Sequence, residues 1–293
     1  MREANVEFLR PDSWREALRI RAERPAATVL AGGTDVMVEV NFGHRRPDAL
    51  LDLTGIGELA DWSESAGRLR IGAGLPYTRL IDELGDRLPG LAMAARTVGS
   101  PQIRNRGTLG GNLGSGSPAG DGHPPLLTSD ALVEVESVRG SRTIPITEFF
   151  TGVKRTALAE DELIAAVHVS PASGPQQFAK VGTRNAMVIA VCTFAVSLHP
   201  ESQRVGTGVG SAGPTPFRAT EAEDFLAAEL DWDADGLPER TAQRFGELVS
   251  AATRPIDDVR GTADYRRHAV GVLARRTLRR VWQDYRTGRS QCA

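Results

Sequence analysis

The sequence predicts an α+β protein with more than one lobe, and three observations lead to that prediction. The chain has 293 residues, and a chain of this size suits two or three lobes of roughly 100–150 residues each. In its N-terminal part, short apolar strands alternate with glycine turns and helices. The C-terminal third instead contains a run of strands followed by a run of helices, an arrangement that is typical of α+β folds.

The N-terminal part begins with a helix and continues with buried strands. Asp12 or Ser13 can cap the first helix, which runs to about residue 22. A short strand at 27–31 leads directly into the glycine turn Gly32–Gly33, and a second helix starts behind it. The other predicted elements of this part are strands at 49–53, 68–72 and 131–136, a helix that begins at Pro76, and a helix at 91–98.

The segment 99–122 differs from its surroundings because it is rich in glycine and contains few apolar side chains. We therefore expect it to lack regular structure and to add little to the core. An irregular stretch of this length inside a compact domain is usually functional or disordered. After a linker at 170–175, the sequence predicts antiparallel strands at 177–181, 188–198 and 204–210 and helices at 218–229, 237–251 and 263–287.

Composition and charge exclude several classes of protein. The 35 basic and 37 acidic residues give a formal net charge of −2, so nothing favours nucleic acid or an anionic membrane as a partner. Cys192 and Cys292 lack the spacing of metal ligands, which excludes a zinc finger or an iron–sulfur cluster held by this chain alone. The N-terminus lacks a signal peptide's apolar stretch, and the apolar run at 187–198 is too short to span a bilayer. We expect a soluble cytoplasmic protein without a metal site.

Two glycine pairs, Gly32–Gly33 and Gly110–Gly111, are candidates for contact with phosphate. Without a Cβ, backbone N–H groups can approach a phosphate closely. Two separate turns suit a ligand with two phosphates that is held from two sides. The alternative is a pair of ordinary tight turns, and for Gly32–Gly33 both interpretations remain open.

A third glycine cluster, Gly208–Gly213, matches the spacing of the dinucleotide-binding fingerprint. That fingerprint must open a helix directly after a strand. Here Pro214 and Pro216 follow at once and no βαβ unit surrounds the cluster. We therefore interpret it as a structural turn.

Three motifs together resemble the FAD-binding medium subunits of the molybdenum hydroxylases, the flavoproteins of the xanthine dehydrogenase and aerobic carbon monoxide dehydrogenase family. They are Ala31-Gly-Gly-Thr-Asp35, the run Val98–Asn112 with its Gln-Ile-Arg-Asn-Arg and Thr-Leu-Gly-Gly-Asn sequences, and Ser117-Pro-Ala-Gly-Asp121. The resemblance covers the whole chain, because Lys180–Arg184 and Gly261–His268 are similar to the family's C-terminal domain.

The resemblance implies a fold, a domain division and a set of cofactor contacts. The fold is a two-lobed FAD-binding domain of the vanillyl-alcohol-oxidase (PCMH) type, with lobes at 1–58 and 59–173, followed by a smaller α+β domain of antiparallel strands and helices at 174–293. The residues placed around the FAD pyrophosphate are Val29, Leu30, Ala31, Gly32, Gly33, Thr34, Asp35 and Val36. A second contact with the phosphate and the ribityl chain is placed at Thr108, Leu109, Gly110, Gly111 and Asn112, and contacts with the polar edges of the cofactor at Ser115, Ser117 and Asp121. Val98, Gly99, Leu158 and Lys180 are placed beside them.

The resemblance also implies a function and partners. A large subunit would hold the molybdenum cofactor, a small subunit would hold two-iron two-sulfur clusters, and FAD on this chain would pass electrons to NAD, oxygen or a quinone. Such redox chemistry belongs to the flavin, so no catalytic residue of this chain is required. Two alternatives remain: a stand-alone FAD-dependent oxidase or dehydrogenase of a biosynthetic pathway, and a non-catalytic nucleotide-binding or scaffold subunit.

Two side chains near these motifs have alternative roles. His123 ends a Gly-Asp-Gly-His run that departs from the family's usual sequence, and it is either a residue at the flavin edge or a solvent-exposed loop histidine. Asp35 either caps the following helix or contacts the cofactor. Relatives with an additional iron–sulfur cluster hold it in a cysteine-bearing insertion, which this chain lacks.

Other charged residues are expected to be structural. His168 and His199 lie in or beside strand-like segments. The last helix has one apolar face, so its arginines form either an anion site or, as we expect, a basic face turned to solvent or to a partner. These arginines are Arg275, Arg276, Arg279 and Arg280.

Overall fold

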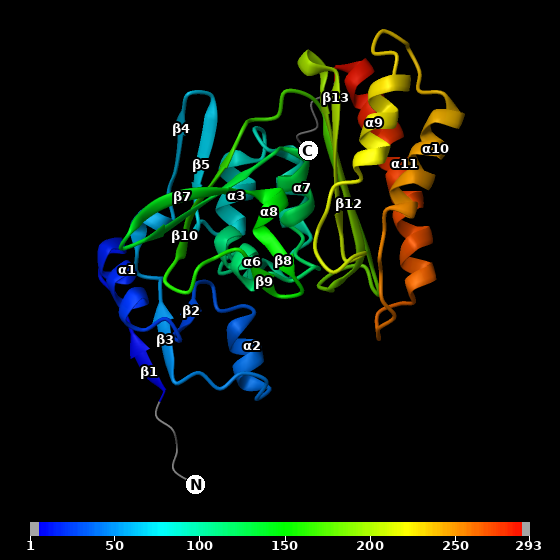
Figure 1. Ribbon diagram of the computed structural model, residues 1–293. Coiled ribbons are helices and arrows are strands. Elements are labelled where there is room, and N and C mark those ends of the chain that lie inside the picture. The colour runs from blue at the N-terminus through cyan, green and yellow to red at the C-terminus, as the bar shows by residue number, and fades with distance from the viewer. Residues whose placement is uncertain (1–5, 289–293) are drawn as a thin grey trace.

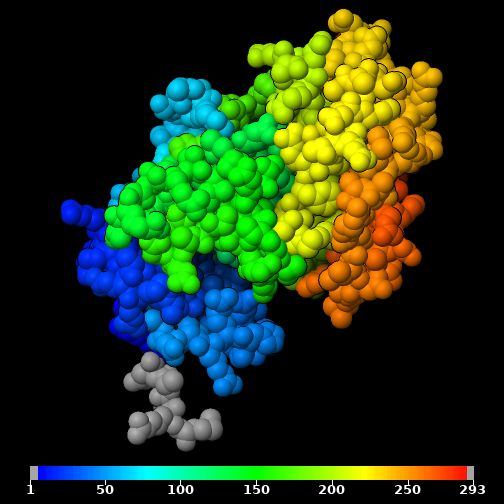
Figure 2. All heavy atoms as spheres, viewed as in Figure 1, coloured from blue at the N-terminus to red at the C-terminus, as the bar shows by residue number. Residues whose placement is uncertain are grey.

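The computed structural model describes residues 6–288, and Cys292 lies outside that range. The chain forms three adjoining parts, seen in Figure 1 as a small sheet with two helices, a larger sheet with short helices, and a third sheet backed by long helices. Figure 2 shows the same parts in contact along the surface: the first is blue, the second runs from cyan to green, and the third from yellow-green to orange-red. Between residues 6 and 288, no helix combines the length and the apolar character needed to cross a membrane.

The first part is a parallel three-stranded sheet in the order β1-β3-β2. Its strands are β1 (Glu7–Leu9), β2 (Thr28–Leu30) and β3 (Ala49–Asp52), and its helices are α1 (Trp14–Glu23), α2 (Val36–Asn41) and the single 3₁₀ turn η1 (Gly57–Leu59). The Ser13 hydroxyl caps α1 by accepting a hydrogen bond from the Glu16 N–H, as predicted. Every residue of β3 is buried because this strand is central. The glycine turn follows β2 and leads into α2, again as predicted.

The second part is an antiparallel five-stranded sheet in the order β4-β5-β10-β6-β7. Its strands are β4 (Trp62–Ser65), β5 (Arg68–Gly72), β6 (Leu132–Ser137), β7 (Gly140–Pro145) and β10 (Leu163–Val169). Its helices are α3 (Tyr77–Leu84), α4 (Pro89–Arg96) and α8 (Ile146–Phe149), and β8 (Phe150–Gly152) pairs with β9 (Arg155–Thr156) in a small hairpin. Only β5 and β6 were predicted. The edge strands β4 and β7 are mostly exposed and lack an apolar pattern, whereas β10 is buried and apolar and was missed all the same.

The expectation that 99–122 lacks regular structure is wrong. The segment contains α5 (Pro101–Arg104) and α6 (Leu109–Ser115) and ends where α7 (His123–Thr128) begins. The hydroxyls of Ser100 and Thr108 cap α5 and α6. The expectation that it adds little to the core is also wrong, because Leu109 and Leu113 are fully buried. Glycine permits this packing: a Cβ at position 110 would lie 2.5 Å from the Cβ of Ala73.

The third part is an antiparallel sheet in the order β11-β12-β13 followed by three helices, and both the antiparallel strands and the helices were predicted. The helices lie on one face of the sheet (Figure 1). Its strands are β11 (Gln176–Gly182), β12 (Ala190–His199) and β13 (Arg204–Gly210), a 3₁₀ turn η2 spans Pro200–Ser202, and its helices are α9 (Thr220–Glu229), α10 (Glu239–Ala251) and α11 (Ala263–Thr287). Phe194 of β12 packs edge-on against Phe245 of α10. Cys192 of β12 is also fully buried, and burial raises the pKa of its thiol to about 12.

The other face of this sheet meets α7, and alternate glycines of β13 make that contact possible (Figure 1). A Cβ at Gly206 would lie 2.5 Å from the carbonyl oxygen of Thr128, and one at Gly208 would collide with that of Pro124. Residues two apart point to the same face of a strand, so these glycines form one backbone contact surface. The interpretation of 208–213 as a turn is therefore wrong for Gly208–Gly210, which belong to β13.

We predict that Gly208→Ala destabilises the protein by about 1–3 kcal/mol, because the new methyl group must push α7 away from β13. Thermal or urea unfolding of the full chain measures the effect. Gly236→Ala is the matched control, since a Cβ there would meet nothing within 4 Å. Equal stability of the two variants would contradict the prediction.

Candidate cofactor site

The turn between β2 and α2 presents backbone N–H groups that the described chain does not use. The N–H groups of Gly32, Gly33, Thr34 and Asp35 donate to no acceptor in residues 6–288. Gly33 has a φ of +75°, a conformation that favours glycine. Consecutive free N–H groups of this kind form a concave anion-binding site. The Asp35 side chain makes no capping hydrogen bond, so the structure does not show the capping role considered for it.

A segment of the second part lies directly against this turn. A Cβ at Gly32 would collide with the carbonyl oxygen of Arg106, and a Cβ at Gly107 would lie 3.5 Å from the Thr34 hydroxyl oxygen. Gly32 is therefore needed for contact between two chain segments, whatever else it contacts. This contact places the start of α6 beside the free N–H groups.

The second glycine pair differs from the first because its N–H groups are already used. The Gly110 N–H donates to the Ala73 carbonyl oxygen at 3.0 Å, and the Gly111 N–H donates to the Thr108 hydroxyl at 2.9 Å. Of the two glycine pairs, Gly32–Gly33 is thus the one whose N–H groups are free within the described residues. Cofactor contact by Thr108, Leu109, Gly110, Gly111 and Asn112 stays a prediction.

Asp121 and Lys180, both suggested by the resemblance, form a buried ion pair that joins the second and third parts. The Lys180 Nζ lies 2.6 Å from the Asp121 Oδ2, and their side chains are 9% and 7% exposed. Lys180 also donates to the Thr97 carbonyl oxygen, and the Thr97 hydroxyl donates to Asp121 Oδ2. Burial raises the pKa of the Asp121 carboxyl, and the charge of Lys180 opposes that shift. The other carboxylate oxygen, Oδ1, has no partner in the described chain.

Sequence reasoning missed Tyr77, the first residue of α3. Its side chain is 2% exposed and its hydroxyl has no hydrogen-bond partner among the described residues. A Cβ at Gly122 would lie 3.2 Å from this hydroxyl and 3.0 Å from Asn112 Oδ1. Burial, and next the negative charges of Asp121 and Asp35, hold the Tyr77 pKa well above its ordinary value. The sequence features that could have drawn attention to Tyr77 are its position directly after Pro76, at a helix start, and the small number of tyrosines in the chain, which is 3.

His123 is fully buried, so the expectation of a solvent-exposed loop histidine is wrong. Gly120 leaves room for the imidazole, since a Cβ there would collide with the ring. The ring centroid lies 4.5 Å from that of Phe150. Nε2 lies 3.2 Å from the Asn112 carbonyl oxygen, so Nε2 must carry the proton. Nδ1 has no partner within the described chain. Burial lowers the His123 pKa to about 4, and a role at the flavin edge stays a prediction.

The remaining predicted contacts lie around the same segments. The Ser115 hydroxyl donates to the Asn112 carbonyl oxygen, and the Ser117 hydroxyl accepts from the Ala119 N–H. Leu158 packs at the edge of the second part's core. Arg104, which sequence reasoning also missed, donates to the carbonyl oxygens of Val98 and Gly99 and so fixes that bend.

Of the charged residues expected to be structural, both histidines and Arg279 make internal contacts, while Arg275 is partly buried and its Nε has no partner in the described chain. His168 Nε2 lies 2.5 Å from Glu134 Oε2, and His199 Nε2 lies 3.0 Å from the Thr128 carbonyl oxygen. On α11, Arg276 and Arg280 are exposed, and Arg279 forms an ion pair with Glu239 of α10.

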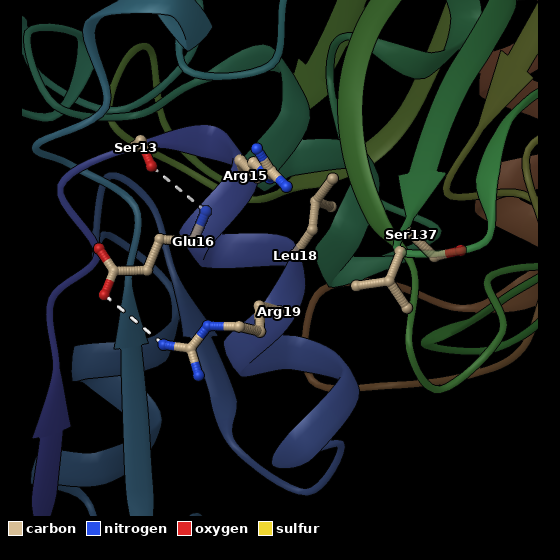
Figure 3. Close-up of a pocket in the computed structure, with 7 residues that line it drawn as sticks. Ser13, Arg15, Glu16, Leu18, Arg19 and Ser137 are labelled. Carbon is tan, nitrogen blue, oxygen red and sulfur yellow. Dashed lines mark hydrogen bonds and ion pairs between the residues drawn. The ribbon is translucent and has the colours of Figure 1, made fainter.

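A surface pocket of about 650 Å³ lies elsewhere, between α1 and the end of β6 (Figure 3). In that view the arginine side chains come from α1, and Ser137 comes from the neighbouring sheet. The lining residues are Ser13, Arg15, Glu16, Leu18, Arg19, Ser137 and Val138. None of them belongs to the predicted cofactor contacts, so this pocket is not the candidate site.

We predict that His123 makes the protein less stable in acid. Its pKa falls from 6.5 to about 4 on folding, so between these pH values the unfolded chain binds a proton that the folded chain does not. The free energy of unfolding therefore decreases as the pH falls through this window, by up to about 3 kcal/mol. Between pH 7 and pH 4, the free energy of unfolding should decrease less for His123→Gln than for the wild type. His44→Gln, at an exposed histidine, should behave like the wild type. Parallel curves for wild type and His123→Gln would contradict this.

Two family models match consecutive parts of the chain. The model described as FAD binding domain in molybdopterin dehydrogenase matches residues 4–172. The model described as CO dehydrogenase flavoprotein C-terminal domain matches residues 177–281.

Curated relatives and solved structures agree with these matches. The chain is 31% identical to a putative xanthine dehydrogenase FAD-binding subunit of Escherichia coli K12 over 274 residues, which cover 90% of this chain and 91% of the relative. It is 34% identical over 236 residues to the nicotinate dehydrogenase FAD-subunit of Eubacterium barkeri, covering 76% and 79% of the two chains. In a carbon monoxide dehydrogenase structure from Hydrogenophaga pseudoflava, one chain is similar with a TM-score of 0.87 and 28% identity, covering 94% and 97% of the two chains.

These matches extend over both halves of the chain. The chain therefore belongs to the family of FAD-binding subunits of the molybdopterin dehydrogenases, the flavoproteins of the molybdenum hydroxylases.

Proposed function

We propose that the chain passes electrons from the iron–sulfur clusters of a partner subunit, through FAD, to an external acceptor. Its family is one of FAD-binding oxidoreductase subunits. The observation that carries the proposal is the row of four unused N–H groups at Gly32–Asp35, which lies beside the start of α6. A diphosphate supplies the acceptors that this row lacks.

The buried polar atoms without partners also fit FAD. Tyr77, Asp121 and His123 each leave one such atom around the turn Gly120–Gly122. A buried polar group without a hydrogen bond is destabilising, and the ribityl chain and flavin ring carry both donors and acceptors. When bound, the flavin supplies the redox chemistry. The chain's residues then hold and orient it: the Gly32–Asp35 amides at the diphosphate, and Asp121 with Lys180 at its polar edge.

The domain division and the full set of contacts belong to this proposal. Lobe 1 would comprise residues 1–58, lobe 2 residues 59–173, and the C-terminal domain residues 174–293. This division keeps the parallel sheet, the five-stranded sheet and the three-stranded sheet each within one unit. The proposed contacts are Val29–Val36, Val98, Gly99, Thr108–Asn112, Ser115, Ser117, Asp121, Leu158 and Lys180.

The partners follow from the relatives. One is named carbon monoxide dehydrogenase medium chain and another 6-hydroxypseudooxynicotine dehydrogenase complex subunit alpha. We propose that this chain likewise works with a large subunit that holds the molybdenum cofactor and a small subunit that holds two-iron two-sulfur clusters, with NAD or another compound as acceptor. A cytoplasmic location suits Cys192, a buried and unpaired thiol.

Purification of the tagged chain from its native cells tests the function. We expect a yellow protein that brings down one molybdenum-containing subunit and one iron–sulfur subunit. Acid precipitation should release the flavin, since neither glycine pair has a histidine or cysteine within its motif that could bond to the flavin covalently. A yellow chain without partners would indicate the stand-alone enzyme instead. A colourless chain would indicate the nucleotide-binding or scaffold role.

We predict that Thr34→Glu lowers the FAD-to-protein ratio at least about tenfold, because it places a negative charge beside amides that receive a diphosphate. The ratio follows from absorbance of the purified chain, and the melting temperature of the flavin-free chain should change little because Thr34 is only half-buried. Thr54→Glu, at an exposed threonine of the same part, should keep its FAD. Full occupancy in Thr34→Glu would show that the diphosphate binds elsewhere.

A further inference from the structure

Tyr77 combines a fully buried ring with a hydroxyl that nothing in the described chain satisfies. Buried tyrosine hydroxyls usually find a hydrogen-bond partner. A phenylalanine would fill the same space without leaving a polar group unpaired. The hydroxyl therefore needs a hydrogen-bond partner, and no atom of the described residues provides one.

The position of Tyr77 connects the two segments of lobe 2 that border the candidate site. Its backbone N–H donates to the Gly107 carbonyl oxygen at 3.0 Å, and a Cβ at Gly107 would lie 3.6 Å from the edge of its ring. Its hydroxyl lies at the other end of the ring, beside Gly122. The side chain thus extends from the segment that touches the Gly32 turn to the turn that carries Asp121.

The hydroxyl donates to no acceptor among the described residues. Asn112 Oδ1 accepts from the Gly122 N–H at 3.3 Å, and Asp121 Oδ2 accepts from Lys180 and Thr97. Asp121 Oδ1 is unpartnered itself. With burial and two negative charges acting on it, the high pKa of Tyr77 keeps the hydroxyl protonated. It is therefore available as a donor.

We propose that the Tyr77 hydroxyl donates a hydrogen bond to an acceptor atom of bound FAD, at the boundary between the diphosphate turn and the Asp121 turn. This assignment rests on the proposed function, since it requires that the chain binds FAD. It makes Tyr77 a cofactor-binding residue in addition to those that the sequence motifs indicate. The competing explanation is a buried water molecule that serves the fold alone.

Tyr77→Phe in the full chain separates these explanations because it removes only the hydroxyl. Fluorescence titration of the flavin-free chain with FAD should give a dissociation constant about 2- to 10-fold higher than that of the wild type, as expected for one lost hydrogen bond. The melting temperature should fall in the FAD-saturated chain and should not fall in the flavin-free chain. Tyr285→Phe, in the aromatic group of Trp232 and Trp282, is the control and should leave FAD affinity unchanged.

Two results would overturn the assignment. An unchanged dissociation constant would show that the hydroxyl does not contact FAD. An equal drop in melting temperature with and without FAD would show that it stabilises the fold through a buried water. Failure of the proposed function looks different, because the wild-type chain would then bind no FAD in the same titration.

Discussion

The candidate site depends on backbone segments that approach one another more closely than any side chain would allow. Gly32 lies against the backbone of 106–107, Gly110 against Ala73, and Gly208 against Pro124. Each contact joins segments that are far apart in sequence, and each would be forced open by a single methyl group. Together they fix the β2 turn, α6 and the three-stranded sheet relative to one another. The shape of the site thus depends largely on the absence of a side chain at these glycines, because only glycine allows the segments to pack this closely.

A polar contact completes this arrangement. Asp121 and Lys180 form a buried ion pair between the loop before α7 and β11. Such a pair contributes little net stability, yet loss of one partner leaves a buried charge and typically costs about 3–5 kcal/mol. The main role of this ion pair is to fix the position of the 121 turn. It holds the 121 turn against the third sheet, and the other carboxylate oxygen of Asp121, Oδ1, has no hydrogen-bond partner in the described chain.

Helices and strands with a clear local sequence pattern could be predicted from the sequence. Elements that form because of tertiary contacts could not. The capped helix after Ser13, the strands of the third sheet and the three C-terminal helices follow local patterns, and the structure contains them. The exposed strands β4 and β7 have no such pattern, because pairing with neighbours creates them.

The site shows the same division. Motifs pointed to Asp121 and Lys180 but could not show that they touch, nor that the amides of Gly110 and Gly111 are already bonded within the chain. The burial of Tyr77 and of His123 depends on how α3, α6 and α7 pack together. Such packing cannot be predicted from a short stretch of sequence. The glycines of β13 were correctly taken as structural despite their ligand-like spacing, but they lie in a strand and not in a turn, and they serve contact between two parts of the chain.

The burial of Cys192 has a chemical consequence for a protein that works with a redox cofactor. With a pKa of about 12, only about one thiol in 10⁵ is ionised near neutral pH, and the thiolate is the form that oxidants and alkylating agents attack. Peroxide that reaches the protein would therefore find no reactive sulfhydryl in residues 6–288. Oxidative damage to this part of the chain would fall on its methionines instead, such as Met187, whose side chain is largely open to solvent.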